Sequence, residues 1–422
     1  MVQWNILLII FLVIFAVNVV FRWLLTYINV RHLRLYGHNV PEVFKGEIDE
    51  ATLSKMSDYT ADTSRFGSIE HFFDDIVTLV ILLSGFLPLL VSIILFYKLN
   101  FILSGLIFFG VLAMLSAVLD IPFNLYSTFV IEKRYGFSTM TVRLWITDFL
   151  KSLIVSAVLM GILLGAMLAL IQYAEHSWWF WVWIFFSLFQ LLMIWLYPVL
   201  IAPLFNKFEP VRDGALKEDI ISLMAKVGLK AKGVFQVDAG KRSKHTNAYF
   251  TGLGKTKRIV LFDTLLNSHS ADEILSVLAH EAGHWKKKHI MKQLVFTEIA
   301  SLAVFYIIYL LLGWPLLYET FGFNQNLPYV GLLLIAALLG PIAFFLAPLG
   351  AILMRKFERE ADDYCLNLLG TVKPMINALK RLAKDNLANL HPHPFYAWFY
   401  YSHPPLAERI ARLWQMEDKK AS

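Results

Sequence analysis

The chain has 422 residues, of which 58% are apolar and 17% charged, and its mean hydropathy is +0.58. This composition excludes an ordinary soluble domain and predicts an integral membrane protein. The net charge of +6 lies in segments between apolar stretches, where it orients the chain in a bilayer, so we expect no nucleic-acid partner. The single cysteine, Cys365, excludes a disulfide within the chain.

Several apolar stretches are long enough to cross a bilayer, whose core needs about 20 helical residues. We predict seven spans, at 4–28, 72–97, 101–124, 149–172, 178–205, 291–313 and 329–354. The first has no basic residue before it and no small-residue cleavage site after it, so we interpret it as a retained span rather than a signal peptide. Asp75, Asp120 and Asn124 lie within or at the ends of spans, where such residues either mark a pathway or sit at the interface.

Basic residues follow the first, third and fifth spans. The alternate connections, at 98–100, 173–177 and 314–328, contain only one Lys or Arg, which is Lys98. The positive-inside rule therefore predicts that the connections 29–71 and 131–148 and the C-terminus are cytoplasmic, and that the N-terminus is outside.

The spans divide the chain into parts. We expect the first five spans in 1–205, a cytoplasmic segment at 206–290, the last two spans in 291–354 and a C-terminal cytoplasmic segment at 355–422. The two cytoplasmic segments together have about 150 residues, enough for a core of their own.

Three short stretches of the first cytoplasmic segment are typical of strands: 233–238, 246–252 and 257–263. The predicted fold is therefore a membrane all-α protein with a small α+β cytoplasmic domain. An edge strand can bind a peptide, and Asn247 can add a hydrogen bond to it or can be an ordinary turn residue.

A candidate metal site lies in "SADEILSVLAHEAGHW", residues 270–285. Ser270 and Glu273 have the spacing of a capping box, and the apolar residues that follow have helical periodicity. On such a helix His280 and His284 project from one face and can chelate one Zn²⁺. Glu281 lies beside them, where it can take a proton from a water that the metal activates.

A catalytic zinc site needs a third protein ligand. Glu358 and Asp362 share a helix face in "MRKFEREADDYCLNLLG", whereas Glu360 points roughly opposite. We predict Glu358 as the third ligand and Asp362 as the acceptor for the free N–H of a ligating histidine. For this segment alone, a solvated charged face is the alternative. Both halves of the site nevertheless adjoin cytoplasmic span ends, which favours the metal site.

Other residues have more than one interpretation. His403, before two prolines, is by itself more typical of a loop histidine. Arg409 either binds a substrate carboxylate or braces the C-terminal helix. Five further histidines could be ligands, but none of them belongs to a pair with ligand spacing and a carboxylate base beside it. They are His245, His269, His289, His391 and His393.

Five segments in this order resemble the type I CaaX prenyl proteases, zinc endopeptidases of the membrane: "PFNLYSTFVIEKRYGF", "HTNAYFTG", "HEAGH", "FEREAD" and "YSHPPLAERI". The resemblance covers nearly the whole chain and implies seven helices that enclose a chamber within the bilayer. It assigns the residues as follows: one Zn²⁺ on His280, His284 and Glu358, Glu281 as general base, substrate contacts at Asn247, Ala248 and Tyr249, and oxyanion stabilisation by His403.

The function expected from this resemblance is removal of the last three residues of a prenylated C-a-a-X peptide, and the expected partners are a prenylated or hydrophobic peptide and the lipid bilayer. One alternative is a membrane quality-control zinc protease without prenyl preference, like the heat-shock metalloproteases. A remote alternative is a metal transporter or channel. The terminal "KKAS" matches an endoplasmic-reticulum retrieval pattern, but the chain looks shorter than the family's eukaryotic members, which favours a bacterial cytoplasmic membrane.

Overall fold

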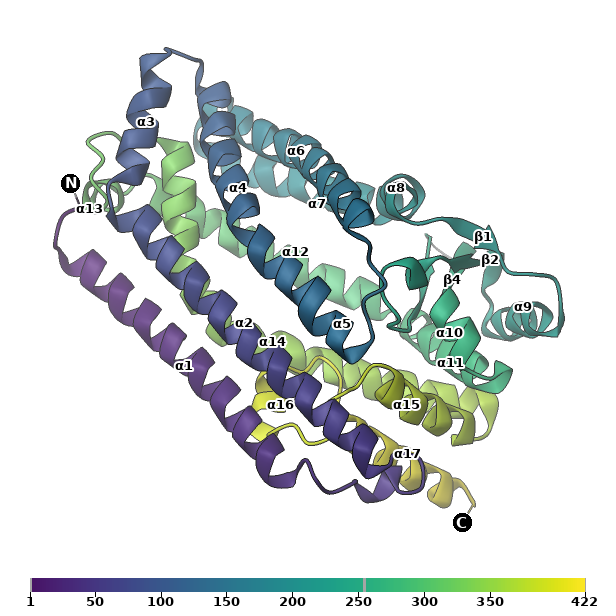
Figure 1. Cartoon of the computed structure of the whole chain (residues 1–422). Helices are drawn as coiled ribbons and strands as arrows, with labels where there is room; N and C mark the ends of the chain where they lie inside the picture. The colour runs from purple at the N-terminus through teal and green to yellow at the C-terminus, as the bar shows by residue number, and fades with distance from the viewer. Residues whose placement is uncertain (1, 253–255, 422) are drawn as a thin grey trace.

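The computed structural model of the chain describes residues 2–252 and 256–421, so the last residue of "KKAS" lies outside the described residues. Its α-helices are α1 (Ile6–Tyr36), α2 (Glu50–Leu83), α3 (Phe86–Phe96), α4 (Phe101–Tyr126), α5 (Glu132–Tyr135), α6 (Val142–Tyr173), α7 (Trp178–Leu196), α8 (Ala202–Phe205), α9 (Ala215–Val227), α10 (Asp263–Ser268), α11 (Ala271–Lys286), α12 (His289–Leu312), α13 (Pro315–Thr320), α14 (Pro328–Leu369), α15 (Lys373–Asp385), α16 (Pro394–Tyr400) and α17 (Leu406–Ala421). Its strands are β1 (Phe208–Pro210), β2 (Lys230–Val237), β3 (Ala248–Thr251) and β4 (Thr256–Phe262). Figure 1 shows long helices side by side, with the sheet at the end of the molecule that also holds the C-terminus.

The number of membrane helices agrees with the seven spans predicted. Six helices in the described part of the chain are long and apolar enough to cross a bilayer, and α2 with α3 forms a seventh that is bent by 56°. The predicted second span, 72–97, was drawn without a break, and the structure interrupts it at Gly85. This glycine has φ +84°, a left-handed conformation that ends one helix and begins the next.

Several helices extend beyond the predicted spans, because hydropathy detects only the apolar part of a helix. α2 begins at Glu50, inside the predicted connection 29–71. α14 passes Pro341 and Pro348 and continues to Leu369, well beyond the predicted span end. The last span and the acidic segment after it are therefore one helix, which holds the acidic side chains in a fixed position relative to the membrane.

The spans pack loosely. In the most apolar window of each single-helix span, the buried share ranges from 0% in α12 to 22% in α1 and α14. A solid bundle would bury a broad stripe of every helix. α4 and α6 line a cavity of about 900 Å³, with Phe109, Ala113 and Ala157 among the residues in its wall. The hollow arrangement agrees with the expected chamber.

A second apolar cluster closes the bundle at the end away from the sheet. It contains buried residues of α3, α7, α13 and the start of α14, such as Leu87, Trp178 and Tyr318. The N-terminus joins it, since Asn5 Nδ2 donates to Thr320 Oγ1 over 2.8 Å. The connections from α3 to α4, from α6 to α7 and from α12 to α14 all adjoin this cluster, on the side opposite the sheet (Figure 1).

The other core belongs to the part with the sheet. Its strand order is β1-β2-β4-β3, with β2 and β4 parallel and both outer strands antiparallel. Three strands match those predicted, and β1, only three residues long and ending in proline, was not predicted. Buried residues from α11, α14, α15 and α17 form one cluster, which also takes in Phe44 and Met56 from the α1–α2 region. The segments 206–290 and 355–422 therefore pack together.

Candidate metal centre

The helix α11 begins as its sequence predicts. Glu273 N donates to Ser270 Oγ over 3.3 Å, and Ser270 N donates to Glu273 Oε2 over 2.7 Å, which completes the capping box. Arg381 of α15 adds an ion pair to Glu273 at 3.1 Å. These contacts fix the start of the helix that carries both histidines.

A close approach of two helices brings the histidines to their acidic partner. α11 crosses α14 at Gly283, where a Cβ atom would lie 3.0 Å from the Cα and O atoms of Ala361. Only a glycine allows this backbone contact without a shift of the helices. Gly283 therefore sets the distance at which His280 and His284 face Glu358.

Three side chains converge at this crossing. The ligand atoms of His280, His284 and Glu358 all lie within 4.8 Å of one another. The two Nε2 atoms are 3.2 Å apart, and each lies 3.2–3.3 Å from an oxygen of Glu358. His280 is 5% exposed and Glu358 3%. The structure thus assembles the three predicted ligands.

The cluster suits a metal ion better than a hydrogen-bonded network. Glu358 Oε2 is buried and has no hydrogen-bond donor among the described residues, although leaving such an atom unsatisfied is costly. Two imidazole nitrogens and one carboxylate oxygen that converge on one point are a typical donor set for Zn²⁺ in a catalytic site. A cation at this point satisfies the orphan oxygen and both nitrogens.

Asp362 and Arg409 support His280. Asp362 Oδ1 lies 2.9 Å from His280 Nδ1, as predicted from the shared helix face. Arg409 donates to both oxygens of Asp362 over 2.6 and 2.8 Å, and its Nη2 also lies 3.1 Å from His280 Nδ1. Asp362 and Arg409 are 1% and 7% exposed. Of the two interpretations of Arg409, the structure therefore favours the brace.

The surroundings of His280 also decide its protonation. Burial and the Arg409 charge lower the pKa of His280, but the adjacent carboxylates of Asp362 and Glu358 outweigh both and raise it to about 9. In the metal-free chain His280 is therefore protonated at neutral pH, and a metal must displace this proton.

His284 has different neighbours, which the sequence did not reveal. Its Nδ1 lies 3.0 Å from Nδ1 of His289, whose Nε2 lies 3.0 Å from Glu360 Oε2. From the sequence, no role was predicted for His289, and Glu360 was predicted to point away from the site. The only signal was the spacing of five residues from His284, and it crosses the break between α11 and α12.

Glu281 and His403 lie at the same cluster. Burial raises the pKa of the Glu281 carboxyl, an effect that His280 and His284 oppose. No hydrogen bond holds this carboxylate among the described residues, so it is free to meet a water. His403 Nε2 lies 3.3 Å from Glu358 Oε1, and its side chain is 62% exposed. Its imidazole thus borders the metal cluster and stays open to a ligand.

The predicted substrate-contact residues lie at an edge of the sheet. Asn247 is exposed and immediately precedes β3, the outer strand, and β3 packs against α11. Asn247 Oδ1 accepts a hydrogen bond from Ala248 N over 2.8 Å, while Tyr249 is half-buried. The unpaired edge of β3 can accept another strand.

The chain before this edge is tied to the membrane helices. Ser243 forms a bridge with Ser138, and Lys244 N donates to Phe137 O over 3.0 Å. The His245 ring stacks on Phe137 at 4.0 Å, and its Nε2 lies 3.4 Å from a Glu132 oxygen. The α5–α6 connection thus positions the strand edge.

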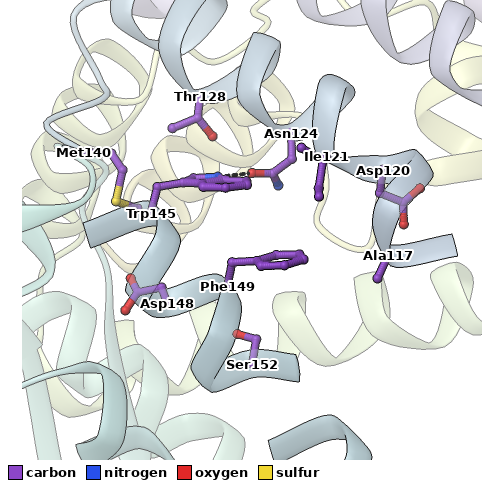
Figure 2. Close-up of a pocket in the computed structure, with 10 residues that line it drawn as sticks. All are labelled: Ala117, Asp120, Ile121, Asn124, Thr128, Met140, Trp145, Asp148, Phe149 and Ser152. Atoms are coloured by element: carbon purple, nitrogen blue, oxygen red, sulfur yellow. Dashed lines mark hydrogen bonds between the residues drawn. The ribbon is translucent and has the colours of Figure 1, made fainter. Parts of the chain in front are cut away.

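The polar residues of the spans divide into two groups. Asp75 forms an ion pair with Arg22 at 2.6 Å. Asp120 and Asn124 line a cavity of about 470 Å³ between α4 and α6, shown in Figure 2. In it Asn124 accepts a hydrogen bond from Trp145 Nε1 over 2.7 Å.

The same cavity connects to the part of the molecule that holds the sheet. The rings of Trp145 and Phe149 are parallel, with centroids 5.4 Å apart (Figure 2). Asp148 at its wall pairs with Arg242, in the segment that leads to β3, over 2.7 Å. The polar wall of the chamber thus lies next to the segment that positions the strand edge.

Comparisons with known proteins agree with this site. Residues 29–207 match the family model of the CAAX prenyl protease N-terminal region with five membrane helices, and residues 210–417 match that of peptidase family M48. The chain is 35% identical to CAAX prenyl protease 1 of Saccharomyces cerevisiae, over 94% of this chain and 93% of the yeast protein. It is 31% identical to the CAAX prenyl protease 1 homolog of Homo sapiens, over 96% of each chain.

A solved structure gives the same result. The crystal structure of Ste24p from S. mikatae superposes with a TM-score of 0.92 at 33% identity, over 97% of this chain and 100% of that one. These matches extend over the spans, the sheet and the metal cluster alike. The chain therefore belongs to the CAAX prenyl protease family within peptidase family M48, and it is an integral membrane metallopeptidase.

Proposed function

We propose that this chain is a zinc endopeptidase that removes the C-terminal tripeptide from prenylated C-a-a-X peptides. The observation that carries the proposal is the cluster of His280, His284 and Glu358, with Glu281 beside it, at the ends of two membrane helices. The names of the relatives support the substrate class, since those from yeast and human are CAAX prenyl proteases.

We propose Zn²⁺ as the metal, one per chain, held by His280, His284 and Glu358. The two imidazoles and the carboxylate leave room for a fourth position, as catalytic zinc sites do. When bound, Zn²⁺ supplies Lewis-acid chemistry, which makes a water nucleophilic near neutral pH and polarises a carbonyl.

The residues of the chain would carry the remaining steps. Glu281, with its free carboxylate, would accept a proton from the attacking water and return it to the leaving nitrogen. His403 would donate a hydrogen bond to the developing oxyanion. Asp362 would keep the His280 ring in the orientation that directs Nε2 to the metal.

The edge of β3 would hold the peptide. Asn247, Ala248 and Tyr249 would pair with it along the backbone, next to the helix that carries Glu281. Because α11 leads directly into the span α12, a scissile bond held there lies close to the membrane boundary. That position suits a cleavage site whose neighbouring cysteine is anchored by a lipid.

We further propose that the N-terminus is outside and that the metal centre and the C-terminus are cytoplasmic. The charge distribution and the position of the two termini at opposite ends of the molecule (Figure 1) support this orientation. The division of the chain at 205, 290 and 354 also stays a prediction. So does the bacterial membrane, although the length argument for it weakens, because the alignment covers 93% of the yeast protein.

The test combines metal analysis of the purified protein with a cleavage assay. A farnesylated peptide and its unmodified counterpart are given to the wild type and to Glu281→Gln. We expect one zinc per chain in both proteins, release of a tripeptide from the farnesylated peptide by the wild type alone, and little cleavage of the unmodified peptide. Equal cleavage of both peptides would instead favour a quality-control protease, and bound zinc without any cleavage would favour a transporter.

A further inference from the structure

Two residues outside the ligand set, His289 and Glu360, lie behind His284. We propose that they form a hydrogen-bonded relay that orients His284 for the metal, which makes both of them positioning residues of the site. This inference rests on the proposed zinc site and adds residues to it. Its evidence is a chain of two polar contacts that joins three residues and begins at a proposed metal ligand.

The direction of each hydrogen bond follows from the first. His284 Nε2 faces the cluster, 3.2 Å from both His280 Nε2 and Glu358 Oε1, so this nitrogen offers its lone pair to a metal. The proton of a neutral His284 must then be on Nδ1. That N–H has His289 Nδ1 as its acceptor, at 3.0 Å.

The second step has the same logic. Since Nδ1 of His289 accepts a hydrogen bond, a neutral His289 carries its proton on Nε2. Nε2 lies 3.0 Å from Glu360 Oε2, a carboxylate oxygen that accepts hydrogen bonds when ionised. Each contact thus requires the next, and the only consistent order is His284 to His289 to Glu360.

The middle of the relay is held rigidly. His289 is 3% exposed, and its ring stacks on Phe357 with centroids 4.2 Å apart and planes within 9°. His289 is also the first residue of α12, which follows Lys288 in a left-handed conformation with φ 57°. The turn at Lys288 aims the first residue of this membrane span back at His284.

The end of the relay lies at the surface. The Glu360 side chain is 27% exposed and has Lys292 at 3.7 Å, and Lys292 also lies over the Phe357 ring at 5.4 Å. Lys292 therefore touches the same carboxylate and the same ring as His289 but is not a link between His284 and Glu360. It provides a matched control.

The test measures zinc affinity by competition with a chelator, using the purified full-length protein. We expect His289→Ala to weaken zinc binding by about 10–100-fold, the usual effect of losing a group that orients a ligand. Glu360→Gln should weaken it in the same direction. Lys292→Gln, the control, should bind zinc like the wild type. In the cobalt-substituted protein, His289→Ala should also shift the visible absorption bands, because the His284 ring changes orientation.

A purely structural role is tested by two further variants. His289→Gln keeps a donor and an acceptor and should restore part of the affinity that His289→Ala loses. The double variant His289→Ala, Glu360→Gln should bind zinc no more weakly than His289→Ala, since both changes interrupt one chain. If His289→Ala lowers the thermal midpoint but binds zinc as tightly as the wild type, the relay is wrong while the zinc site stands. A wild type that holds no zinc would overturn both.

Discussion

The two histidines that we propose as metal ligands, His280 and His284, lie one turn apart on α11, and different residues support each of them. His280 contacts a carboxylate directly, and this Asp362 is 1% exposed and paired with the buried Arg409. His284 reaches its carboxylate, Glu360, only through a second imidazole, at an edge open to solvent. One side of the site is therefore built as part of the core, and the other as part of the junction with a membrane span.

Both carboxylates come from the same short stretch of α14. Glu358 faces both histidines, Asp362 lies one turn further on the same face, and Glu360 projects to the other side, towards α12. This segment resembles a solvated charged face in sequence, yet each carboxylate has its own partner. Glu358 contacts both histidines, Asp362 contacts His280, and Glu360 contacts His289. The His280 side and the His284 side should therefore respond differently to loss of their carboxylates, Asp362 and Glu360.

The largest effect is expected from Glu281→Gln, which separates chemistry from metal binding. Neither Asp362 nor Glu360 contacts Glu281, so zinc should stay bound. The rate of peptide cleavage should fall by about 10²–10⁴-fold or more, the usual contribution of a general base. Metal content and cleavage rate are measured on the same preparation. Glu218→Gln, at an exposed position on α9, is the control. Substantial cleavage by a clean Glu281→Gln preparation would refute the assignment.

Asp362→Asn should cause the largest loss of stability on the core side. It removes the nearest carboxylate from the buried Arg409 charge and leaves only Glu358 at 3.7 Å, and breaking such a buried pair destabilises a protein by about 3–5 kcal/mol. The thermal midpoint and the zinc affinity should both fall. Asp363→Asn removes the neighbouring, half-exposed carboxylate that pairs with Arg412 and should change stability by only about 0–1 kcal/mol. Equal effects of the two variants would contradict the buried support.

Glu360→Gln should differ from Asp362→Asn in kind. Because Glu360 is partly exposed and Lys292 beside it is free to turn to solvent, we expect a clear loss of zinc affinity with little change in the thermal midpoint. A large fall of the thermal midpoint would show that Glu360 supports the fold as Asp362 does, and that the two sides of the site do not differ.

Gly283→Ala should disturb both sides together. The added methyl group meets the α14 backbone at 3.0 Å, and overpacking of this kind costs about 1–3 kcal/mol. The separation of α11 from α14 would increase, so zinc affinity should fall. Gly350→Ala is the control on α14, where a Cβ meets nothing within 4 Å. Tight zinc binding by Gly283→Ala would show that the crossing does not set the ligand geometry.

The smallest effect is expected from the pH dependence of the contact between His245 and Glu132, which helps to position β3. The hydrogen bond to Glu132 raises the pKa of His245 above its usual 6.5, against the opposing effect of burial. The pair therefore stabilises the fold fully below pH 6.5, and this contribution is lost as pH rises through the raised pKa. Amide exchange near residues 137–139 and 243–247 should accelerate over that interval, and His245→Gln should remove the pH dependence. An unchanged profile in that variant would contradict the prediction.

The sequence was sufficient for groups whose geometry depends on one helix. The i, i+4 spacing predicted His280 and His284 on one face, and likewise Glu358 and Asp362, and the structure brings these two faces together. The number of spans followed from hydropathy in the same way. The bend at Gly85 did not, since apolar residues continue on both sides of it.

Features that depend on three elements were missed. His289 reaches His284 across the turn at Lys288, so no helical spacing relates them. Glu360 was correctly turned away from Glu358, but α14 also packs against α12, and the opposite face is therefore not solvent. The chamber is likewise invisible to hydropathy, which cannot distinguish a helix that faces lipid from one that faces a hollow.

The most direct test of the account is zinc K-edge X-ray absorption on the purified wild type. We expect one zinc per chain, with two imidazole nitrogens at about 2.0–2.1 Å and carboxylate oxygen at about 2.0–2.2 Å. In Glu358→Gln the zinc content or the oxygen shell should change. A protein without stoichiometric zinc, or a spectrum that keeps the same oxygen shell after Glu358→Gln, would show that His280, His284 and Glu358 do not hold the metal.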